Sequence, residues 1–276
     1  MSNFGLEGGR RAREESGRDA DGARAPLTLC VDSATDAASV AVARGAGVVA
    51  KSGGVGRRGQ SLALLSEIDE TLRAARVSLA EIELFAVAAG PGSFTGLRAG
   101  LATVKAFAAS SSRPVAAIPT LHAVAASGGA SAQTIAAIPA GRGEVFAQAL
   151  SVDEDGRVAE LTRARHVSPP ALIAQALASR GLVKWVGGGA HAHLSLLREA
   201  AAGEGIALAV GASEEAASAG AGGRVWEVVA GAGDYAAEIA ALSLISYMDG
   251  TLVGAGELRA QYVRLSDAEL KEQCQG

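Results

Sequence analysis

Along residues 26–118 the spacing of apolar residues switches between the period of a strand and the period of a helix. Short apolar runs predict strands, and apolar residues that recur every three or four positions predict amphipathic helices. The predicted order is three strands, a helix, a strand, a second helix and a final strand. These elements fall at residues 27–31, 38–43, 48–51, 60–76, 84–89, 95–110 and 115–118.

A second set of strand and helix patterns begins near Ser131. Strands are predicted at residues 133–138, 145–150, 161–167 and 182–186. Pro169-Pro170 opens a helix that is expected to run to Ser179, and an Ala- and Leu-rich final helix is expected from Tyr235 to Tyr247. Residues 211–223 are of low complexity and are interpreted as a loop.

These patterns predict an α/β protein with a leader and two subdomains. Residues 1–25 hold five arginines and five acids with almost no apolar periodicity, so we expect a disordered leader or a start codon assigned too far upstream. The first subdomain is expected at residues 26–126. The second is expected at residues 127–276, with the final helix and an extended C-terminal tail.

The composition allows a large buried core and gives no sign of an isolated nucleic-acid-binding protein. Of the 276 residues, 49% are hydrophobic and only 4% aromatic, so small and aliphatic side chains must fill the core. The net charge of −4 supplies no basic face, so contact with nucleic acid is expected only through a partner. Cys30 and Cys274 have neither disulfide nor metal spacing, and no apolar run would span a membrane, which favours the cytoplasm.

Three segments carry a resemblance to a known family. Residues 29–42 form an apolar strand, an Asp-Ser-Ala-Thr turn and a second strand; residues 90–100 read GPGSFTGLRAG; and residues 143–146 read GEVF. Together they resemble the TsaB (YeaZ) family, accessory subunits of bacterial tRNA threonylcarbamoyladenosine biosynthesis and paralogues of TsaD in the actin-like ATPase (ASKHA) superfamily. The resemblance implies two ribonuclease-H-like halves, each a mixed sheet flanked by helices. It is strong over residues 27–126 and limited to short segments beyond.

The glycine-rich segment has a physical interpretation of its own. Pro91 fixes φ and the glycines permit positive φ, so the chain can turn sharply from strand to helix. Ser93 or Thr95 can cap that helix, whose first amides would face an anion. Gly96 and Gly100 permit close approach of another segment. A tightly packed turn and an occupied phosphate site both remain open.

Asp32 ends the first strand, where actin-like ATPases place a carboxylate beside a phosphate-binding turn. The turn that follows lacks glycine, so we favour a structural role in which Asp32 and Thr35 hold the hairpin by Asx-type bonds. No cofactor is expected to be required, although weak ATP or ADP binding stays open. The residues of such a vestigial nucleotide site would be Asp32, Ser33, Thr35, Gly90, Gly92, Ser93, Gly188 and Gly189.

No metal site or catalytic residue is expected. TsaD has two metal-binding histidines four residues apart, and alignment on the strand at 115–118 places Thr120 and Val124 at those positions. His122 is out of register by two residues. His191 and His193 lack a neighbouring carboxylate or cysteine, so a loop-to-helix junction is the favoured interpretation.

The resemblance implies a non-catalytic scaffold subunit. It would pair with a TsaD-like catalytic subunit and a TsaE-like ATPase in transferring threonylcarbamoyl to the tRNA adenosine beside the anticodon, and would also self-associate. The partner-binding residues are expected on the first two helices, at Leu62, Leu65, Ile68, Leu72, Leu97, Gly100, Leu101 and Val104. The alternative is an independent ATPase or kinase that uses Asp32 and the Gly90–Gly96 turn. The metallopeptidase label of the wider family would need a zinc site that Thr120 and Val124 do not provide.

Overall fold

A computed structural model describes residues 24–53, 64–211, 223–229 and 233–263 of the chain. The chain forms two compact units, and each is treated by itself. Unit 1 combines residues up to Ala89 with Phe94–Ile118 and Asp234–Arg259. Unit 2 combines Gly90–Ser93 with Pro119–Gly233 and the residues from Ala260 onward.

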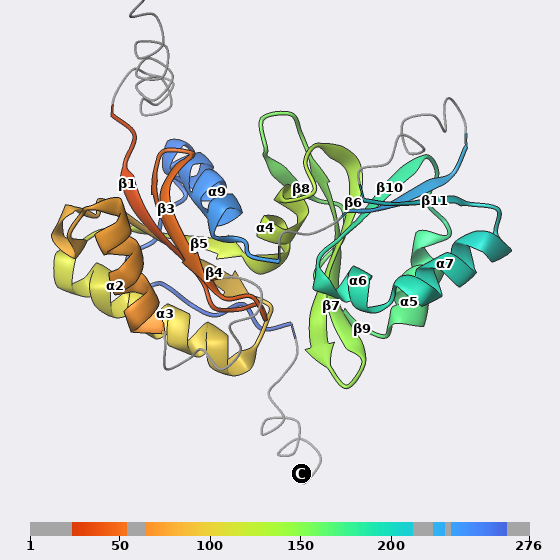
Figure 1. Ribbon diagram of the computed structural model, residues 1–276, viewed down its shortest axis with the longest axis horizontal. Coiled ribbons are helices and arrows are strands. Elements are labelled where there is room, and N and C mark those ends of the chain that lie inside the picture. Colours follow the sequence, from red (N-terminus) through yellow and green to blue (C-terminus); the bar gives the residue numbers. More distant parts are fainter. Residues whose placement is uncertain (1–23, 54–63, 212–222, 230–232, 264–276) are drawn as a thin grey trace, which may run out of the picture. The chain divides into compact units, whose positions relative to one another are not determined.

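From β1 to β5, the strands and α-helices of unit 1 follow the order that the sequence predicts (Figure 1). Its sheet has the strand order β3-β2-β1-β4-β5; β1 is antiparallel to β2 and parallel to β4. The elements are β1 (Leu27–Asp32), β2 (Ser39–Arg44), β3 (Gly47–Gly53), α2 (Leu64–Ala75), β4 (Leu84–Gly90), α3 (Phe94–Ser111), β5 (Val115–Pro119) and α9 (Ala236–Met248).

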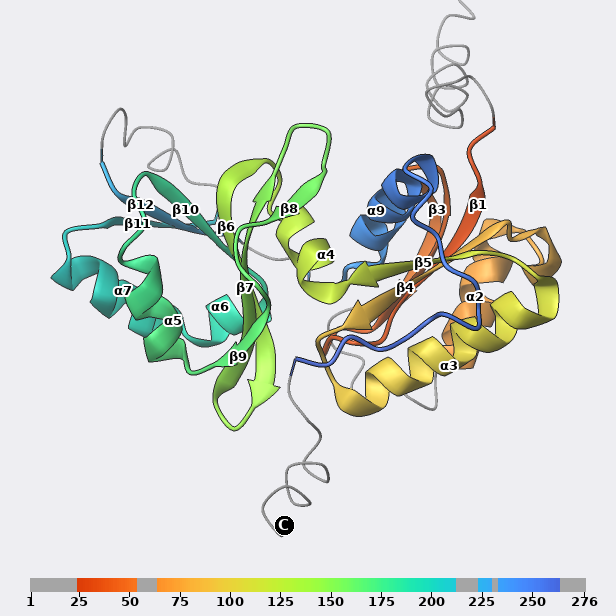
Figure 2. The ribbon, with the colours of Figure 1, turned by 180° about the vertical axis from the view of Figure 1, so that it is seen from behind.

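The central strand β1 is buried on both faces because helices cover both sides of the sheet. Val31 lies next to Gly100 of α3, whereas Cys30, which points to the opposite face, contacts Ser243 of α9. Figure 2 shows α2 and α3 on one side of the strands and α9 on the other. Asp32 shares the α9 face with Cys30, and this position determines its surroundings.

The final helix lies in unit 1, whereas we expected it in the second subdomain. The Ala236 amide at the start of α9 donates to the Ser39 hydroxyl on β2 at 3.3 Å. Ile239, Ala240 and Leu242 are buried. A helix with so many apolar positions must be covered, and the open face of the first sheet covers it. The chain therefore returns to unit 1 after unit 2.

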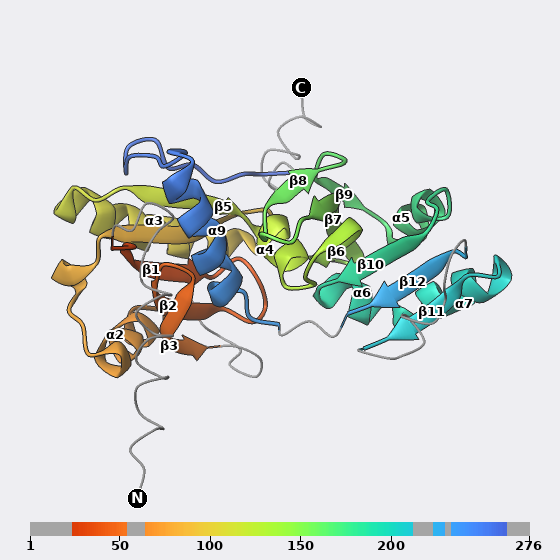
Figure 3. The same cartoon turned by 90° about the horizontal axis from the view of Figure 1, so that it is seen from above.

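Unit 2 is a larger mixed sheet with helices on both faces. Its strand order is β11-β12-β10-β6-β7-β8, with β9 also paired to β7, and Figure 3 shows β6, β10, β12 and β11 in sequence across the sheet. The elements are α4 (Thr120–Ala126), β6 (Ser131–Gly141), β7 (Glu144–Val152), β8 (Val158–Glu160), β9 (Arg165–Val167), α5 (Pro169–Ala176), β10 (Leu182–Val186), α6 (Gly188–Ala192), α7 (Leu194–Gly203), β11 (Ala207–Val210) and β12 (Val225–Val228).

One strand prediction in unit 2 is wrong. Of the strand expected at 161–167, only Arg165–Val167 (β9) forms, and the strand before it, β8, has already ended at Glu160. The amides of Leu161 and Thr162 both donate to the carbonyl of Ala149. Two residues opposite one form a bulge, which ends β8 before β9 begins. Helix α5 also ends at Ala176, three residues before Ser179.

The core of unit 2 contains an aromatic pair, despite the low aromatic content of the chain. Trp185 of β10 and Trp226 of β12 meet edge to face, with ring centroids 5.2 Å apart, and each is 1% exposed. Among the described residues no helix has the length and apolarity to cross a membrane.

Candidate functional site

The Asp32 carboxylate is fully buried at the end of β1 and is bound by the turn that follows it. It accepts hydrogen bonds from the Ala34 amide at 2.9 Å, the Thr35 amide at 3.3 Å and the Thr35 hydroxyl at 2.6 Å. These are the Asx-type bonds expected from the sequence. Burial raises the pKa of Asp32 to about 6, and the three hydrogen bonds only partly oppose this rise.

Further acids approach Asp32 from α9 and from the residues just before it. Asp234 adds a repulsion that raises the pKa of Asp32 further, and burial raises the pKa of Glu238. Lys51 of β3 pairs with Asp234 at 2.7 Å. Sequence reasoning missed this cluster because it placed α9 in the other subdomain. Among the described residues, no group of three His, Cys, Asp or Glu side chains has a metal-binding arrangement.

Ser33 and Gly100 join the end of β1 to α3. The Ser33 hydroxyl donates to the Gly96 carbonyl at 2.8 Å. A Cβ on Gly100 would lie 2.1 Å from the Ser33 Oγ, so only glycine allows this approach. The segment close to Gly100 is the end of the first strand and the residue after it, and it approaches through the side chains of Val31 and Ser33.

The glycine residues of the proposed nucleotide site lie in unit 2, whereas Asp32, Ser33 and Thr35 lie in unit 1. Gly90 has a φ of +121°, as a turn glycine can. Gly189 lies against the Ala137 backbone, and Gly188 is exposed. Gly92 is half-buried and Ser93 is exposed. A nucleotide site shared by these two sets stays a prediction.

Thr120 and Val124, the residues at the expected histidine positions, are buried on α4 and serve in packing. The Thr120 hydroxyl accepts the Gly90 amide at 3.2 Å. The Val124 Cγ1 lies 2.8 Å from where a Cβ on Gly187 would stand. Neither side chain supplies the imidazole nitrogen that a metal would take.

The histidines have other partners. His122 lies 3.2 Å from the Glu160 carboxylate, and burial lowers its pKa more than this neighbour raises it. His166 pairs with Glu144 at 2.9 Å. The ring of His191 lies 2.8 Å from the Val229 carbonyl, and His193 separates α6 from α7, as expected for a loop-to-helix junction.

Most of the expected partner-binding side chains are part of the core of unit 1. Only Leu65, which is 61% exposed, is open to solvent among those that the structure describes; Leu62 lies outside the described residues. The buried ones are Ile68, Leu72, Leu97, Gly100, Leu101 and Val104. Helical periodicity identified the apolar face correctly, and that face packs on the chain's own sheet. A role of these six residues in partner binding stays a prediction.

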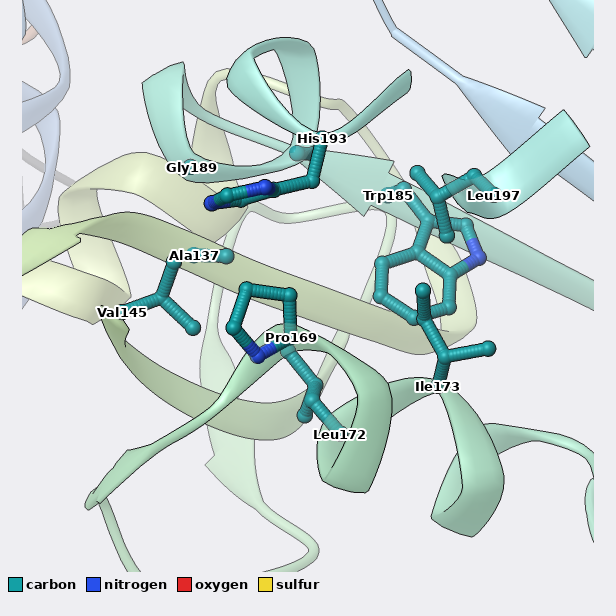
Figure 4. Close-up of a pocket in the computed structure, with 10 residues that line it drawn as sticks. Ala137, Val145, Pro169, Leu172, Ile173, Trp185, Gly189, His193 and Leu197 are labelled. Atoms are coloured by element: carbon teal, nitrogen blue, oxygen red, sulfur yellow. The ribbon is translucent and has the colours of Figure 1, made fainter. Parts of the chain in front are cut away.

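A small pocket in unit 2 lies between the sheet and helices α5, α6 and α7. Figure 4 shows the His193 ring on one side of it and Pro169 on the other, with the indole nitrogen of Trp185 turned away from Ala137. Its volume of about 10 Å³ is close to what a single water needs. The pocket is too small for a nucleotide.

The family model described as TsaD, tRNA N6-adenosine threonylcarbamoyltransferase, matches residues 38–179, about half of the chain. The chain belongs to the TsaD family. It is also 31% identical over 131 residues to the tRNA threonylcarbamoyladenosine biosynthesis protein TsaB of Escherichia coli (strain K12). That match covers 46% of this chain and 56% of the relative, so it spans about half the length of the relative.

Two solved structures share the fold. YeaZ from Pseudomonas aeruginosa has a TM-score of 0.64 at 20% identity, over 86% of this chain and 99% of that one. An uncharacterised protein described as similar to peptidase YeaZ, also from Pseudomonas aeruginosa, has a TM-score of 0.61 at 20% identity, over 87% and 100%. The match to Escherichia coli TsaB and the family model, together with these structures, confirm the resemblance to TsaB (YeaZ) proteins. The family model and the structural match to YeaZ together confirm the actin-like ASKHA fold.

Proposed function

We propose that this protein is a non-catalytic accessory subunit in the biosynthesis of threonylcarbamoyladenosine on tRNA. It pairs with a TsaD-like catalytic subunit and a TsaE-like ATPase, and it meets tRNA only within that complex. The proposal combines the family membership with the contacts that Thr120 and Val124 of α4 make within the chain.

The observation that carries the non-catalytic part is the chemistry of Thr120 and Val124. The Thr120 hydroxyl is committed to the Gly90 amide, and the Val124 methyl group packs on the Gly187 turn. A hydroxyl and a methyl group at these positions cannot bind a metal as two imidazoles would. The chemistry of transfer is therefore assigned to the partner.

The docking surface for that partner is placed on the outer side of α2 and α3. Leu65 of α2 is 61% exposed and Phe94 at the start of α3 is 41% exposed, with the Arg98 guanidinium 3.8 Å above the Phe94 ring centroid. Exposed apolar and aromatic side chains are typical anchors of protein interfaces. The same surface would serve self-association.

Leu65→Glu tests this surface. A carboxylate at an interface must lose its water, so we expect co-purification with the TsaD-like subunit to weaken at least about tenfold. Leu161→Glu is the matched control, because Leu161 is 51% exposed and lies in unit 2. If the two folded variants bind the partner equally well, the interface does not include Leu65 of α2.

Reconstitution tests the function itself. The purified chain is combined with its partners, tRNA and the threonylcarbamoyl donor, and the modified nucleoside is measured by mass spectrometry. We expect modification to be lost when this chain is omitted, and no modification from this chain alone. Full modification without it would contradict the accessory role.

A calorimetric titration with Mg-ATP separates the alternative of an independent ATPase. Micromolar binding, with turnover that disappears in Asp32→Asn, would favour that alternative. The accessory role predicts no such turnover, because the Asp32 carboxylate is already bound by the turn of Ala34 and Thr35.

A further inference from the structure

The backbone amide of Gly90 is already used within unit 2. It donates to the Thr120 hydroxyl, and Thr120 is 1% exposed. A phosphate-binding turn offers its free amides to an anion. At Gly90 the amide points instead to the first residue of α4.

The other side of Gly90 faces the chain's own C-terminal segment. A Cβ at Gly90 would lie 2.3 Å from the carbonyl oxygen of Gln261 and 3.2 Å from its carbonyl carbon. Such contacts do not occur in folded proteins, so the peptide of Gln261 rests where any other side chain would stand. We call residues 260–263 the strap.

We propose that the Gly90 turn serves to bind the strap, and that the strap, rather than an anion, occupies this turn. Gly90 is then required for two reasons that involve no nucleotide: a φ of +121° and the contact with Gln261. While the strap is docked, its peptide fills the space on the Cβ side of Gly90, and the amide of Gly90 stays bound to Thr120.

At the second glycine turn of unit 2, the chain's own atoms again occupy the position of a side chain. At Gly187, with a φ of +103°, a Cβ would lie 2.4 Å from the Ala137 carbonyl oxygen and 2.8 Å from the Val124 Cγ1. Helix α4 thus holds both turns, through Thr120 at one and Val124 at the other. At both of these turns, glycine leaves room for the chain's own backbone.

Release of the strap can be measured by trypsin cleavage at Arg259–Ala260 in the full chain, followed by mass spectrometry. Cleavage requires a detached segment, so its rate follows the population of released strap. In Gly90→Ala we expect cleavage about tenfold faster than in the wild type. Gly129→Ala is the matched control, since Gly129 also has positive φ, at +69°, but has no atom near its Cβ position.

Tryptophan fluorescence reports whether unit 2 remains folded, because both tryptophans of the chain lie there. Thr120→Val provides a second variant of nearly equal volume that removes only the acceptor of the Gly90 amide. For it we expect cleavage about threefold faster. Unchanged cleavage in both folded variants would overturn the proposal.

In a further experiment, inorganic phosphate or Mg-ATP is added to the trypsin cleavage assay. The proposal predicts that neither changes the cleavage rate of the wild type. A saturable acceleration by either probe would mean that an anion displaces the strap from the turn, and the proposal would be wrong.

Discussion

The two units bury their strand-end turns in opposite ways. After β1 of unit 1 the turn encloses a carboxylate, Asp32. Asp234, just before α9, and Glu238 of α9 lie in the same region. After β10 of unit 2 the turn is Gly187, which is closed by the Ala137 carbonyl and the Val124 side chain. One turn is held by hydrogen bonds to a charge and the other by close packing.

The contrast implies that the two units respond to different stresses. A buried carboxylate with a raised pKa links stability to protonation. In a packed apolar turn, stability depends on how well the atoms fit together. The free energy of unfolding that is lost when a packed side chain is truncated is nearly independent of pH. Variants in each unit can therefore separate charge from packing.

The largest effect is expected from Trp226→Ala in unit 2. Removal of this fully buried ring leaves a cavity beside Trp185 and should lower the free energy of unfolding by about 3–5 kcal/mol. Chemical denaturation followed by the remaining tryptophan measures it, with Trp226→Phe as the milder control. A loss of unfolding free energy that differed strongly between pH 5 and pH 7 would contradict the view that unit 2 depends on packing rather than on charge.

Gly100→Ala tests the packed contact of unit 1. The new methyl group would lie 2.1 Å from the Ser33 Oγ, so we expect a loss of about 1–3 kcal/mol in the free energy of unfolding. Ser33→Ala removes that oxygen, and the double variant should recover part of the loss. Thermal unfolding by circular dichroism measures all three, and strict additivity would show that the two residues do not meet.

Asp32→Asn tests the charge. The pKa of Asp32 is about 6 in the folded chain against 3.8 unfolded, so its contribution to stability is fully present below pH 3.8 and is lost as the pH rises through 6. Asparagine stays neutral, and we expect a gain of roughly 1–2 kcal/mol at pH 7 that vanishes near pH 4.

Unfolding midpoints across pH 4–8 check this expectation. The pKa of Glu238 is also raised, so the stability of the variant should still fall somewhat as the pH rises. A loss of stability in Asp32→Asn at pH 7 would mean that the hydrogen bonds from Thr35 outweigh the cost of burying the charge.

The smallest effect is expected from Lys51→Met. The pair of Lys51 with Asp234 is partly exposed, and its loss should cost about 0.5–1 kcal/mol in low salt and less in high salt. Arg73→Met is the control, because its pairing with Asp69 on α2 is well exposed. A cost equal to that of the control would show that Lys51 does not compensate the buried acids.

The sequence predicts the local elements of this fold well and its long-range partners poorly. Strands such as β1 and β10 follow from short, mostly apolar runs, and the Asx bonds of Asp32 follow from residues two and three positions away. The placement of α9 does not, because the sequence next to it belongs to unit 2.

The candidate site shows the same limit. Periodicity separates Ile68 and Leu72 from the polar side of α2, but it cannot distinguish a face that packs on the chain's own sheet from one that meets a partner. The bond between Thr120 and Gly90 joins residues 30 positions apart and has no local signal. The motif at 90–100 indicates the family, whereas only the fold identifies what Gly90 contacts.

The return of α9 to unit 1 has a consequence for synthesis of the chain. The Ala236 amide and the Ser39 hydroxyl are 197 residues apart, so the sheet face with Cys30 and Asp32 is uncovered until nearly the whole protein has left the ribosome. A nascent chain halted before residue 236 would present that apolar face to chaperones.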